Sequence, residues 1–142
     1  MRSVIMVCSG NTCRSPMAEA LLRQMLPGAD VSSAGLYAVN GMPASDGAQR
    51  EMERRGLSLA NHRSRQLTRE MARGALLLCM TQSHLFALRQ AWPDVAADAL
   101  MHFAGLRGDV DDPFGGDGAD YRRAADQIEA ALRRIVDEGR LE

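Results

Sequence analysis

The sequence predicts an α/β protein in which helices cover both faces of a parallel sheet. Two observations indicate this fold class. Short, continuous apolar runs, such as Ser3 to Val7 and Ala75 to Met80, are typical of strands buried on both faces. Segments with helical apolar spacing follow these runs, so strands and helices alternate along the chain. Ligands of such sheets bind at the carboxyl ends of the strands.

The first strand leads into a helix. Ser15 is expected to cap the N-terminus of this helix, with Pro16 in its first turn. Apolar residues then recur with helical spacing until Pro27 and Gly28 end the helix. A second short strand is expected to end near Ser33.

A loop rich in glycine, proline and asparagine over residues 36–47 leads into a helix that contains Met52 and ends at Gly56. The run up to Met80 is the clearest strand, and Thr81 caps a helix that follows it. A weaker apolar run near residues 98–103 is expected to form the fourth strand. After a loop rich in glycine and aspartate, the last helix presents one apolar face, formed by Ala124, Ala125, Ile128, Ala131, Leu132, Ile135 and Val136.

The composition suits one globular domain over residues 1–142, with 46% hydrophobic and 25% charged residues. A net charge of −1 predicts no general attraction to nucleic acid or acidic membranes. All 17 basic residues are arginine, which excludes a lysine Schiff base and a lysine-containing phosphate loop. No segment resembles a signal peptide or a membrane span. Three cysteines without scaffold spacing predict reduced thiols and a cytoplasmic location.

The segment between the first strand and the first helix can form an anion-binding loop. A loop that turns into a helix N-terminus directs backbone N–H groups and the positive end of the helix dipole toward one point. Gly10 and Asn11 are residue types that tolerate the left-handed backbone needed for this turn. Arg14 can grip two oxygens of a phosphate-like anion.

Cys8 begins this loop, so its sulfur is expected at the floor of a positively charged site. A helix N-terminus and a nearby cation favour the thiolate form of a cysteine. The Cys-x5-Arg-Ser spacing therefore predicts phosphoryl transfer to sulfur. Cys13 is also close enough for a disulfide with Cys8, or it is a small packing residue. No metal site is expected, because neither the spacing nor nearby histidines supply a ligand set.

The segment VCSGNTCRSP resembles the signature of the low-molecular-weight protein tyrosine phosphatase family. Further family elements follow in order: Ser33-Ala34-Gly35, the segment HRSRQL from His62 to Leu67, and Asp112-Pro113-Phe114. The resemblance covers nearly the whole chain. It implies a three-layer fold with a four-stranded parallel sheet flanked by helices on both faces, and a phosphate-binding loop after the first strand. It also implies a two-step reaction that needs no cofactor.

By this resemblance, Cys8 attacks phosphorus and becomes a phosphocysteine, while Arg14 and the loop amides hold the phosphate oxygens. Asp112 protonates the leaving group and then takes a proton from water. Ser15 donates a hydrogen bond to the departing thiolate. Asn11, Ser33 and His62 form the polar network that supports the loop. The residues expected to bind substrate are Ser9, Gly10, Asn11, Thr12, Cys13, Ser15 and Phe114.

Two assignments in this set have alternatives. Asp111 competes with Asp112 for the acid role, and the family pattern, which places the acid next to proline, favours Asp112. The resemblance further implies reversible oxidation, in which Cys13 protects Cys8 from over-oxidation; the alternative is that Cys13 is a small packing residue.

The substrate class depends on Thr12. Family members that act on phosphotyrosine commonly carry an aliphatic residue at this position, and aromatic residues around the pocket mouth. Here Val39 and Asn40 lie nearest the family's aromatic gate, although Tyr37 is in the same loop. Thr12 together with the segment DPFGG resembles the bacterial protein-arginine phosphatase branch.

We therefore expect a phosphatase of phosphoarginine in proteins, with phosphotyrosine as the alternative substrate. Inorganic phosphate is the expected product and an inhibitor, and neither nucleic acid nor a membrane is an expected partner. An arsenate reductase would need two further cysteines, whereas only Cys79 remains. A phosphate-binding module without activity is disfavoured by the intact Cys8, Arg14, Ser15 and Asp112.

Overall fold

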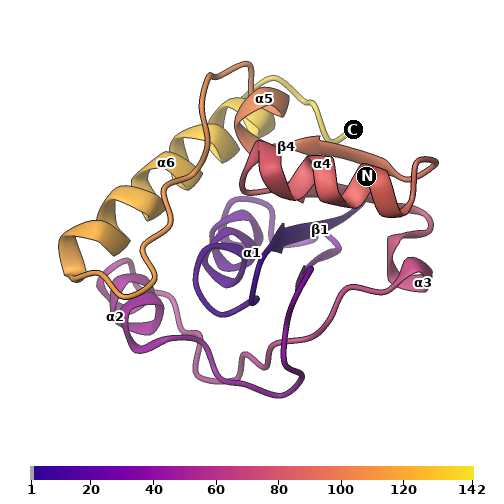
Figure 1. Cartoon of the computed structure of the whole chain (residues 1–142). Coiled ribbons are helices and arrows are strands. Elements are labelled where there is room, and N and C mark those ends of the chain that lie inside the picture. The colour runs from indigo at the N-terminus through magenta and orange to yellow at the C-terminus, as the bar shows by residue number, and fades with distance from the viewer. Residues whose placement is uncertain (1) are drawn as a thin grey trace.

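The structure is a computed structural model that describes residues 2–142. Its strands are β1 (Ser3–Cys8), β2 (Val31–Gly35), β3 (Ala75–Cys79) and β4 (Ala96–Ala99). Its helices are α1 (Arg14–Met25), α2 (Asp46–Arg54), α3 (Arg69–Ala72), α4 (Gln82–Ala91), α5 (Leu100–Phe103) and α6 (Gly118–Asp137) (Figure 1). The strands form one sheet in the order β2-β1-β3-β4, and all pairs are parallel. The predicted four-stranded parallel sheet is confirmed.

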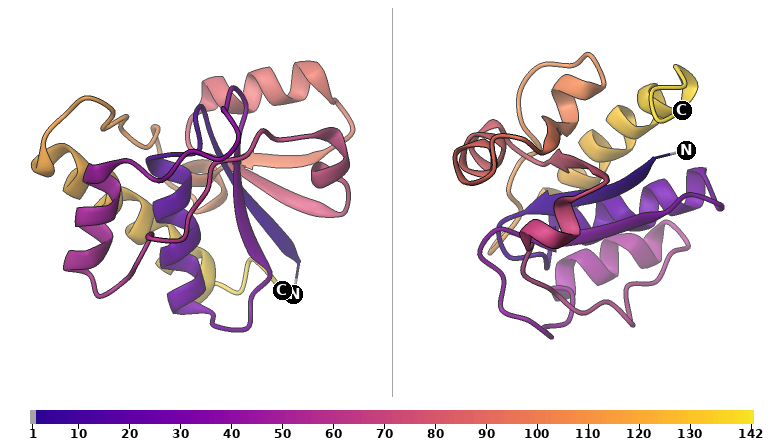
Figure 2. Two further views of the ribbon diagram at one scale, coloured as in Figure 1. Left: turned by 90° about the horizontal axis from the view of Figure 1, so that it is seen from below. Right: turned by 90° about the vertical axis from the view of Figure 1, so that its right-hand side faces the viewer.

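Helices cover both faces of this sheet (Figure 2). Side chains of β1 alternate between two apolar clusters, as a strand buried on both faces requires. Val4 and Met6 pack into the cluster that contains α1, α2, α5 and α6. Ile5 and Val7 pack into the smaller cluster that contains α3 and α4. This division confirms the expected three layers.

The register of the strands brings their carboxyl ends to one edge. Cys8 at the end of β1 pairs with Gly35 at the end of β2, and Val7 pairs with Cys79 of β3. The segments that follow β1, β2 and β3 therefore meet at this edge. At the other end of the chain, the N–H of Arg2 donates to the carbonyl of Leu141, so the two ends of the described chain lie side by side (Figure 2).

Three element boundaries differ from the sequence prediction. Helix α1 begins at Arg14 with Cys13 in the N-cap position, so the prediction that Ser15 caps the helix is wrong. The hydroxyl of Ser15 is used instead for contacts with Cys8 and Asn11.

The fourth strand ends at Ala99, and the apolar residues after it form the short helix α5, whose Leu100 and Met101 enter the core. The second strand extends two residues past Ser33 to Gly35 because it remains paired with β1 up to Cys8. Within residues 2–142, no helix has the length and apolar character that crossing a membrane requires.

Candidate active site

The candidate active site is the loop between β1 and α1, at the carboxyl edge of the sheet. Residues Ser9 to Cys13 leave β1 and turn directly into α1. Asn11 has a φ of +59°, the left-handed conformation for which asparagine is suited. Gly35 of β2 permits a close approach, because a Cβ there would lie 2.5 Å from the carbonyl oxygen of Ser9. The loop is therefore packed tightly against the end of β2.

A directed chain of hydrogen bonds ends at the sulfur of Cys8. Because the carboxylate of Glu19 only accepts, the hydroxyl of Ser33 donates to it over 2.6 Å. The side-chain amide of Asn11 donates to Ser33 at 2.9 Å and to Ser15 at 2.8 Å. Since the oxygen of Ser15 accepts from Asn11, its own proton is available to the sulfur of Cys8, 2.9 Å away. The network thus aims a donor at the expected nucleophile.

The segment from His62 to Leu67 braces Asn11 from the other side. The N–H of Arg65 donates to Oδ1 of Asn11 at 3.0 Å, which fixes the orientation of the amide. Nε2 of His62 lies 2.7 Å from the carbonyl oxygen of Asn11, so this nitrogen carries the ring proton. The structure therefore brings the predicted supporting residues Asn11, Ser33 and His62 together.

Arg14 joins this loop to the segment that carries Asp112. Its buried guanidinium donates through Nη1 to the carbonyl of Val110 at 3.1 Å, and Nη2 lies 3.6 Å from Oδ2 of Asp112. The N–H of Val110 donates in turn to the carbonyl of Met80, just after β3. One arginine can therefore hold a bound anion and also fix the position of the acidic loop.

Asp112 and Asp111 have different surroundings. Asp112 lines the pocket, and its Oδ1 accepts from the N–H of Phe114 at 3.1 Å. The exposed Asp111 does not line the pocket, and its N–H donates to the side chain of Gln127. The geometry therefore favours Asp112 as the candidate acid, as the sequence predicts.

A pocket of about 280 Å³ is lined by Cys8, Ser9, Gly10, Thr12, Cys13, Arg14, Tyr37, Asp112 and Phe114. The side chains of Asn11 and Ser15, which were also predicted to bind substrate, are fully buried and take part in the network that supports the loop. Tyr37 and Phe114 are 72% and 76% exposed. The pocket thus has a nucleophile and a cation inside it and two aromatic rings at its mouth.

Cys13 forms part of the pocket wall and contacts two hydroxyl groups. Its sulfur lies 3.3 Å from Oγ of Ser45 and 3.4 Å from the hydroxyl of Tyr121. Burial, together with the hydrogen bond to Cys13, raises the pKa of Tyr121 above its ordinary value. Gly47 makes room for this ring, because a Cβ there would lie 2.3 Å from a ring carbon. Cys8 and Cys13 are both free thiols, and the disulfide between them stays a prediction.

Cys79 has the properties of a packing residue. It is fully buried in β3, and burial raises the pKa of its thiol to about 12. A thiol of this kind is a poor nucleophile at neutral pH. The structure therefore gives no support to an arsenate reductase that relays oxidation through Cys79. Within residues 2–142, no cluster of three or more histidine, cysteine, aspartate or glutamate side chains could hold a metal ion.

His84, in the first turn of α4, is a buried neighbour of the loop that the sequence analysis missed. Its Nε2 lies 2.8 Å from Oγ of Ser9, and its Nδ1 lies 2.8 Å from Oγ1 of Thr81. Burial and the positive charge of Arg14 lower the pKa of His84 to about 4, so the ring is uncharged at neutral pH. The one available sequence signal was its position near the start of the helix that follows a strand, at the edge of the sheet where ligands of parallel sheets bind.

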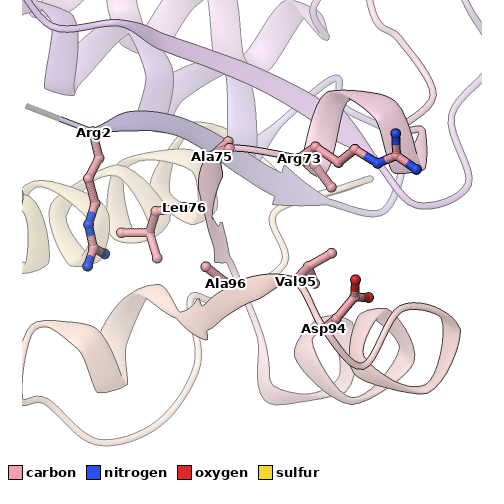
Figure 3. Close-up of a pocket in the computed structure, with 9 residues that line it drawn as sticks. Arg2, Arg73, Ala75, Leu76, Asp94, Val95 and Ala96 are labelled. Carbon is pink, nitrogen blue, oxygen red and sulfur yellow. The ribbon is translucent and has the colours of Figure 1, made fainter.

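A larger cavity, of about 450 Å³, lies at the opposite, amino edge of the sheet, where β3 and β4 begin (Figure 3). Arg2, Arg73 and Asp94 surround it together with small and apolar residues of the two strands. None of the residues that the motifs single out lines this cavity. The candidate chemistry is therefore concentrated at the carboxyl edge.

Known proteins resemble this chain over nearly its whole length. A family model described as low molecular weight phosphotyrosine protein phosphatase matches residues 3–141. A protein-arginine-phosphatase of Geobacillus stearothermophilus is 40% identical over 139 residues, which cover 94% of this chain and 93% of that protein. The probable low molecular weight protein-tyrosine-phosphatase EpsP of Ralstonia solanacearum is 37% identical over 136 residues, which cover 95% of this chain and 89% of that protein.

The fold shows the same similarity. The structure of the YwlE arginine phosphatase from Geobacillus stearothermophilus matches this one with a TM-score of 0.93 at 38% sequence identity. The match covers 99% of this chain and 94% of that chain. Both the sheet and the helices around it are therefore shared with a solved structure.

Proposed function

The chain belongs to the low-molecular-weight phosphotyrosine protein phosphatase family, and we propose that it hydrolyses phosphoarginine in proteins through a phosphocysteine at Cys8. The family that the motifs indicated is confirmed, and the chain is a phosphatase of that family. The observation that carries the choice of substrate is the position of Thr12 in the wall of the pocket that contains Cys8 and Asp112.

In the first proposed step, the sulfur of Cys8 attacks phosphorus. The sulfur–phosphorus bond forms as the bond from phosphorus to the guanidinium nitrogen breaks, and its electron pair stays on nitrogen. A protonated Asp112 gives its proton to that nitrogen, so that arginine leaves as a stable cation. Arg14 and the N–H groups at the start of α1 stabilise the charge on the phosphate oxygens. The placement of all three side chains around one pocket supports this step.

In the second proposed step, water attacks the phosphorus of the phosphocysteine. The carboxylate of Asp112 takes a proton from this water, the sulfur–phosphorus bond breaks, and inorganic phosphate is released. Cys8 leaves as a thiolate. The proton of Ser15 that is available to this sulfur, 2.9 Å away, stabilises the departing charge.

Thr12 supports phosphoarginine over phosphotyrosine. The hydroxyl of Thr12 can accept a hydrogen bond from a guanidinium N–H, whereas a phenyl ring has no donor to offer it. Thr12 is half-buried, and a net gain of about 1 kcal/mol from one hydrogen bond changes a preference by up to about tenfold. A planar guanidinium can also stack on the aromatic rings of Tyr37 and Phe114 at the pocket mouth. A relative that is 40% identical is itself an arginine phosphatase.

Phosphotyrosine is the second candidate substrate, for one specific reason. The side chains of Tyr37 and Phe114 at the pocket mouth could enclose a phenyl ring as readily as a guanidinium. The 37% identical relative described as a probable tyrosine phosphatase agrees with this alternative.

The deciding experiment compares kcat/KM for phosphoarginine and phosphotyrosine on the same reduced protein. The expected result is a clear preference for phosphoarginine. Thr12→Val keeps the shape of threonine but removes its hydroxyl, and it should lower the preference by about tenfold. Thr12→Ile also adds a methyl group to the wall and should move the preference further toward phosphotyrosine.

Three outcomes of this comparison can be separated. A preference for phosphotyrosine in the unmodified protein would contradict the proposed substrate. An unchanged ratio in both Thr12 variants would remove Thr12 as its cause. Turnover of neither compound, nor of 4-nitrophenyl phosphate, would contradict the proposed reaction itself.

We also propose that the chain acts in the cytoplasm on phosphorylated proteins, with inorganic phosphate as product and inhibitor. The free thiols of Cys8, Cys13 and Cys79 suit a reducing compartment. On exposure to a hydroperoxide, Cys8 and Cys13 would together lose two electrons and two protons and form a disulfide, while the peroxide is reduced to an alcohol and water. This disulfide would remove the nucleophile reversibly.

A further inference from the structure

His84 is a buried titratable side chain beside the pocket, and the proposed reaction assigns it no role. It is 7% exposed and makes side-chain hydrogen bonds through both ring nitrogens, to Ser9 and to Thr81. Ser9 follows β1 and Thr81 follows β3, which are neighbouring strands. His84 therefore connects the start of the phosphate-binding loop to the start of α4.

The charge of the ring restricts how these hydrogen bonds can run. Burial and the nearby guanidinium of Arg14 keep the ring neutral above a pH of about 4, although Asp109 and Asp112 act in the opposite direction. A neutral imidazole has one N–H and one accepting nitrogen. The ring of His84 therefore donates a hydrogen bond to one of the two hydroxyls, Ser9 or Thr81, and accepts a hydrogen bond from the other.

The position of Thr81 favours one of the two arrangements. The oxygen of Thr81 already accepts the backbone N–H of His84 at 3.1 Å, as the cap of α4. Its own proton is then well placed to go to Nδ1 of His84, 2.8 Å away. This leaves the ring proton on Nε2, from where it is donated to the oxygen of Ser9, 2.8 Å away.

We propose that His84 is a positioning residue that donates from Nε2 to the hydroxyl of Ser9 and thereby leaves the Ser9 proton for the oxyanion in the pocket. Ser9 lines the pocket, so a hydroxyl oriented in this way adds one donor to the backbone N–H groups and to Arg14. The inference rests on the proposed use of this pocket for phosphate chemistry. His84 thus affects binding of the oxyanion only through the hydroxyl of Ser9.

A backbone hydrogen bond of Ser9 limits how far the loop should change when His84 is replaced. The carbonyl of Ser9 accepts the N–H of Tyr37 at 2.9 Å, so the backbone of Ser9 stays anchored when its side chain is released. Removal of the histidine should therefore change the direction of one hydroxyl rather than the path of the loop. The loss of one such hydrogen bond corresponds to about a tenfold effect on the affinity for the anion.

Two amide variants distinguish the contribution of Nε2 of His84 from that of Nδ1. The side-chain amide of His84→Gln can reach the place of Nε2 and donate to Ser9, whereas the shorter amide of His84→Asn reaches only the place of Nδ1, beside Thr81. We expect His84→Asn to lower kcat/KM for 4-nitrophenyl phosphate by about tenfold and to weaken inhibition by inorganic phosphate to a similar degree. His84→Gln should stay within about threefold of the unmodified protein.

A double-mutant cycle with Ser9→Ala tests whether the effect passes through Ser9. If it does, adding His84→Asn to Ser9→Ala should change kcat/KM by less than about twofold. An undiminished tenfold loss in the Ser9→Ala background, or equal losses for His84→Gln and His84→Asn, would overturn the proposal. Both outcomes would give His84 a packing role only.

The two proposals fail in distinguishable ways. If the proposed substrate class is wrong, the protein will prefer phosphotyrosine over phosphoarginine. The expected effects of the His84 variants on turnover of 4-nitrophenyl phosphate do not depend on that preference. If the protein turned over no phosphate ester, calorimetric titration with inorganic phosphate would still compare the His84 and Ser9 variants. Equal phosphate affinity across all of these variants would then overturn the role of His84 by itself.

Discussion

At the scale of single residues, the clearest test of the general acid compares replacement of Asp112 with replacement of Asp111. Asp112→Asn keeps the Oδ1 atom that accepts from the N–H of Phe114, so the turn should persist while proton transfer is lost. We expect kcat for phosphoarginine to fall by about 100-fold, the lower range for loss of a general acid. Asp111→Asn should stay within about twofold, because Asp111 does not line the pocket.

The leaving group provides the control for this prediction. 4-Nitrophenolate leaves readily without protonation, so the first step with 4-nitrophenyl phosphate should depend much less on Asp112 than the step with phosphoarginine. kcat/KM reports only the first step and excludes hydrolysis of the phosphocysteine that both compounds share. Equal losses in kcat/KM for the two compounds would mean that Asp112 acts on the shape of the loop instead of on the leaving-group proton. A larger loss in Asp111→Asn than in Asp112→Asn would reverse the assignment of the acid.

The residues around Cys8 show which parts of a site can be predicted from sequence. Cys8, Arg14 and Ser15 are neighbours in one motif, and their spacing indicates the anion site directly. Most of their supporting partners come from distant segments, where a single arginine or histidine has no diagnostic spacing. Ser33 and His62 were expected only through the family resemblance. Glu19, which accepts from Ser33, and His84, which contacts Ser9, became visible only in the folded chain.

At the scale of secondary-structure elements, an ion-pair network centred on the buried Glu51 joins α2 to α6. The carboxylate of Glu51 is 3% exposed and pairs with Arg54 at 2.6 Å and with Arg55 at 2.9 Å. Arg55 continues to Asp126 and Glu129 on α6. Glu51→Gln keeps the size of the side chain but leaves Arg55 without its most buried partner. Arg55 keeps Asp126 and Glu129 as partners, so we expect the free energy of unfolding, measured by urea denaturation, to fall by about 1.5 kcal/mol.

A matched control is available in the exposed pair between Arg69 and Asp94, whose side chains are 46% and 71% exposed. Arg69→Gln removes one charge from this pair and should cost about 0.5 kcal/mol or less. Similar losses for Arg69→Gln and Glu51→Gln would show that burial of the Glu51 network adds nothing to the docking of α2 on α6. A loss of free energy of unfolding in Glu51→Gln but not in Arg69→Gln would support the role of the network in docking α2 on α6.

Elements were predictable where burial leaves a clear pattern. The central strands β1 and β3 are buried on both faces and gave continuous apolar runs, which placed them within one or two residues. Strand β4 lies at the edge of the sheet and is only partly buried, so its four residues carry no such run. The apolar residues that suggested a strand there, including Leu100 and Met101, belong to α5. In sequence, the apolar run of a short buried helix cannot be distinguished from that of a buried strand.

At the scale of the whole molecule, the site is assembled from segments that only the complete sheet brings together. The end of β1 supplies Cys8 and the start of α1 supplies Arg14. The segment after β2 supplies Tyr37, and the loop before α6 supplies Asp112. Side chains of β1 contribute to both apolar clusters, one on each face of the sheet. We propose on this basis that residues 1–142 form a single domain in which the site and the core are one cooperative unit.

An anion that binds this assembled site should therefore stabilise the entire fold. Inorganic phosphate at 100 times its dissociation constant contributes about 2.7 kcal/mol if only the native state binds it. For a chain of this size, that corresponds to a rise in Tm of about 8 °C, measured by calorimetry. Cys8→Ser should lose all turnover but keep this rise, because the serine leaves the loop amides and Arg14 in place.

Arg14→Ala should lose most of the rise in Tm, because the guanidinium is both a ligand for the anion and the link to the loop that carries Asp112. Sodium chloride at equal ionic strength separates binding from general screening. Arg73→Ala is the matched control, since Arg73 belongs to the larger cavity at the opposite edge of the sheet. If Arg73→Ala abolished the rise and Arg14→Ala kept it, phosphate would bind at that cavity, and the loop after β1 would not be the anion site.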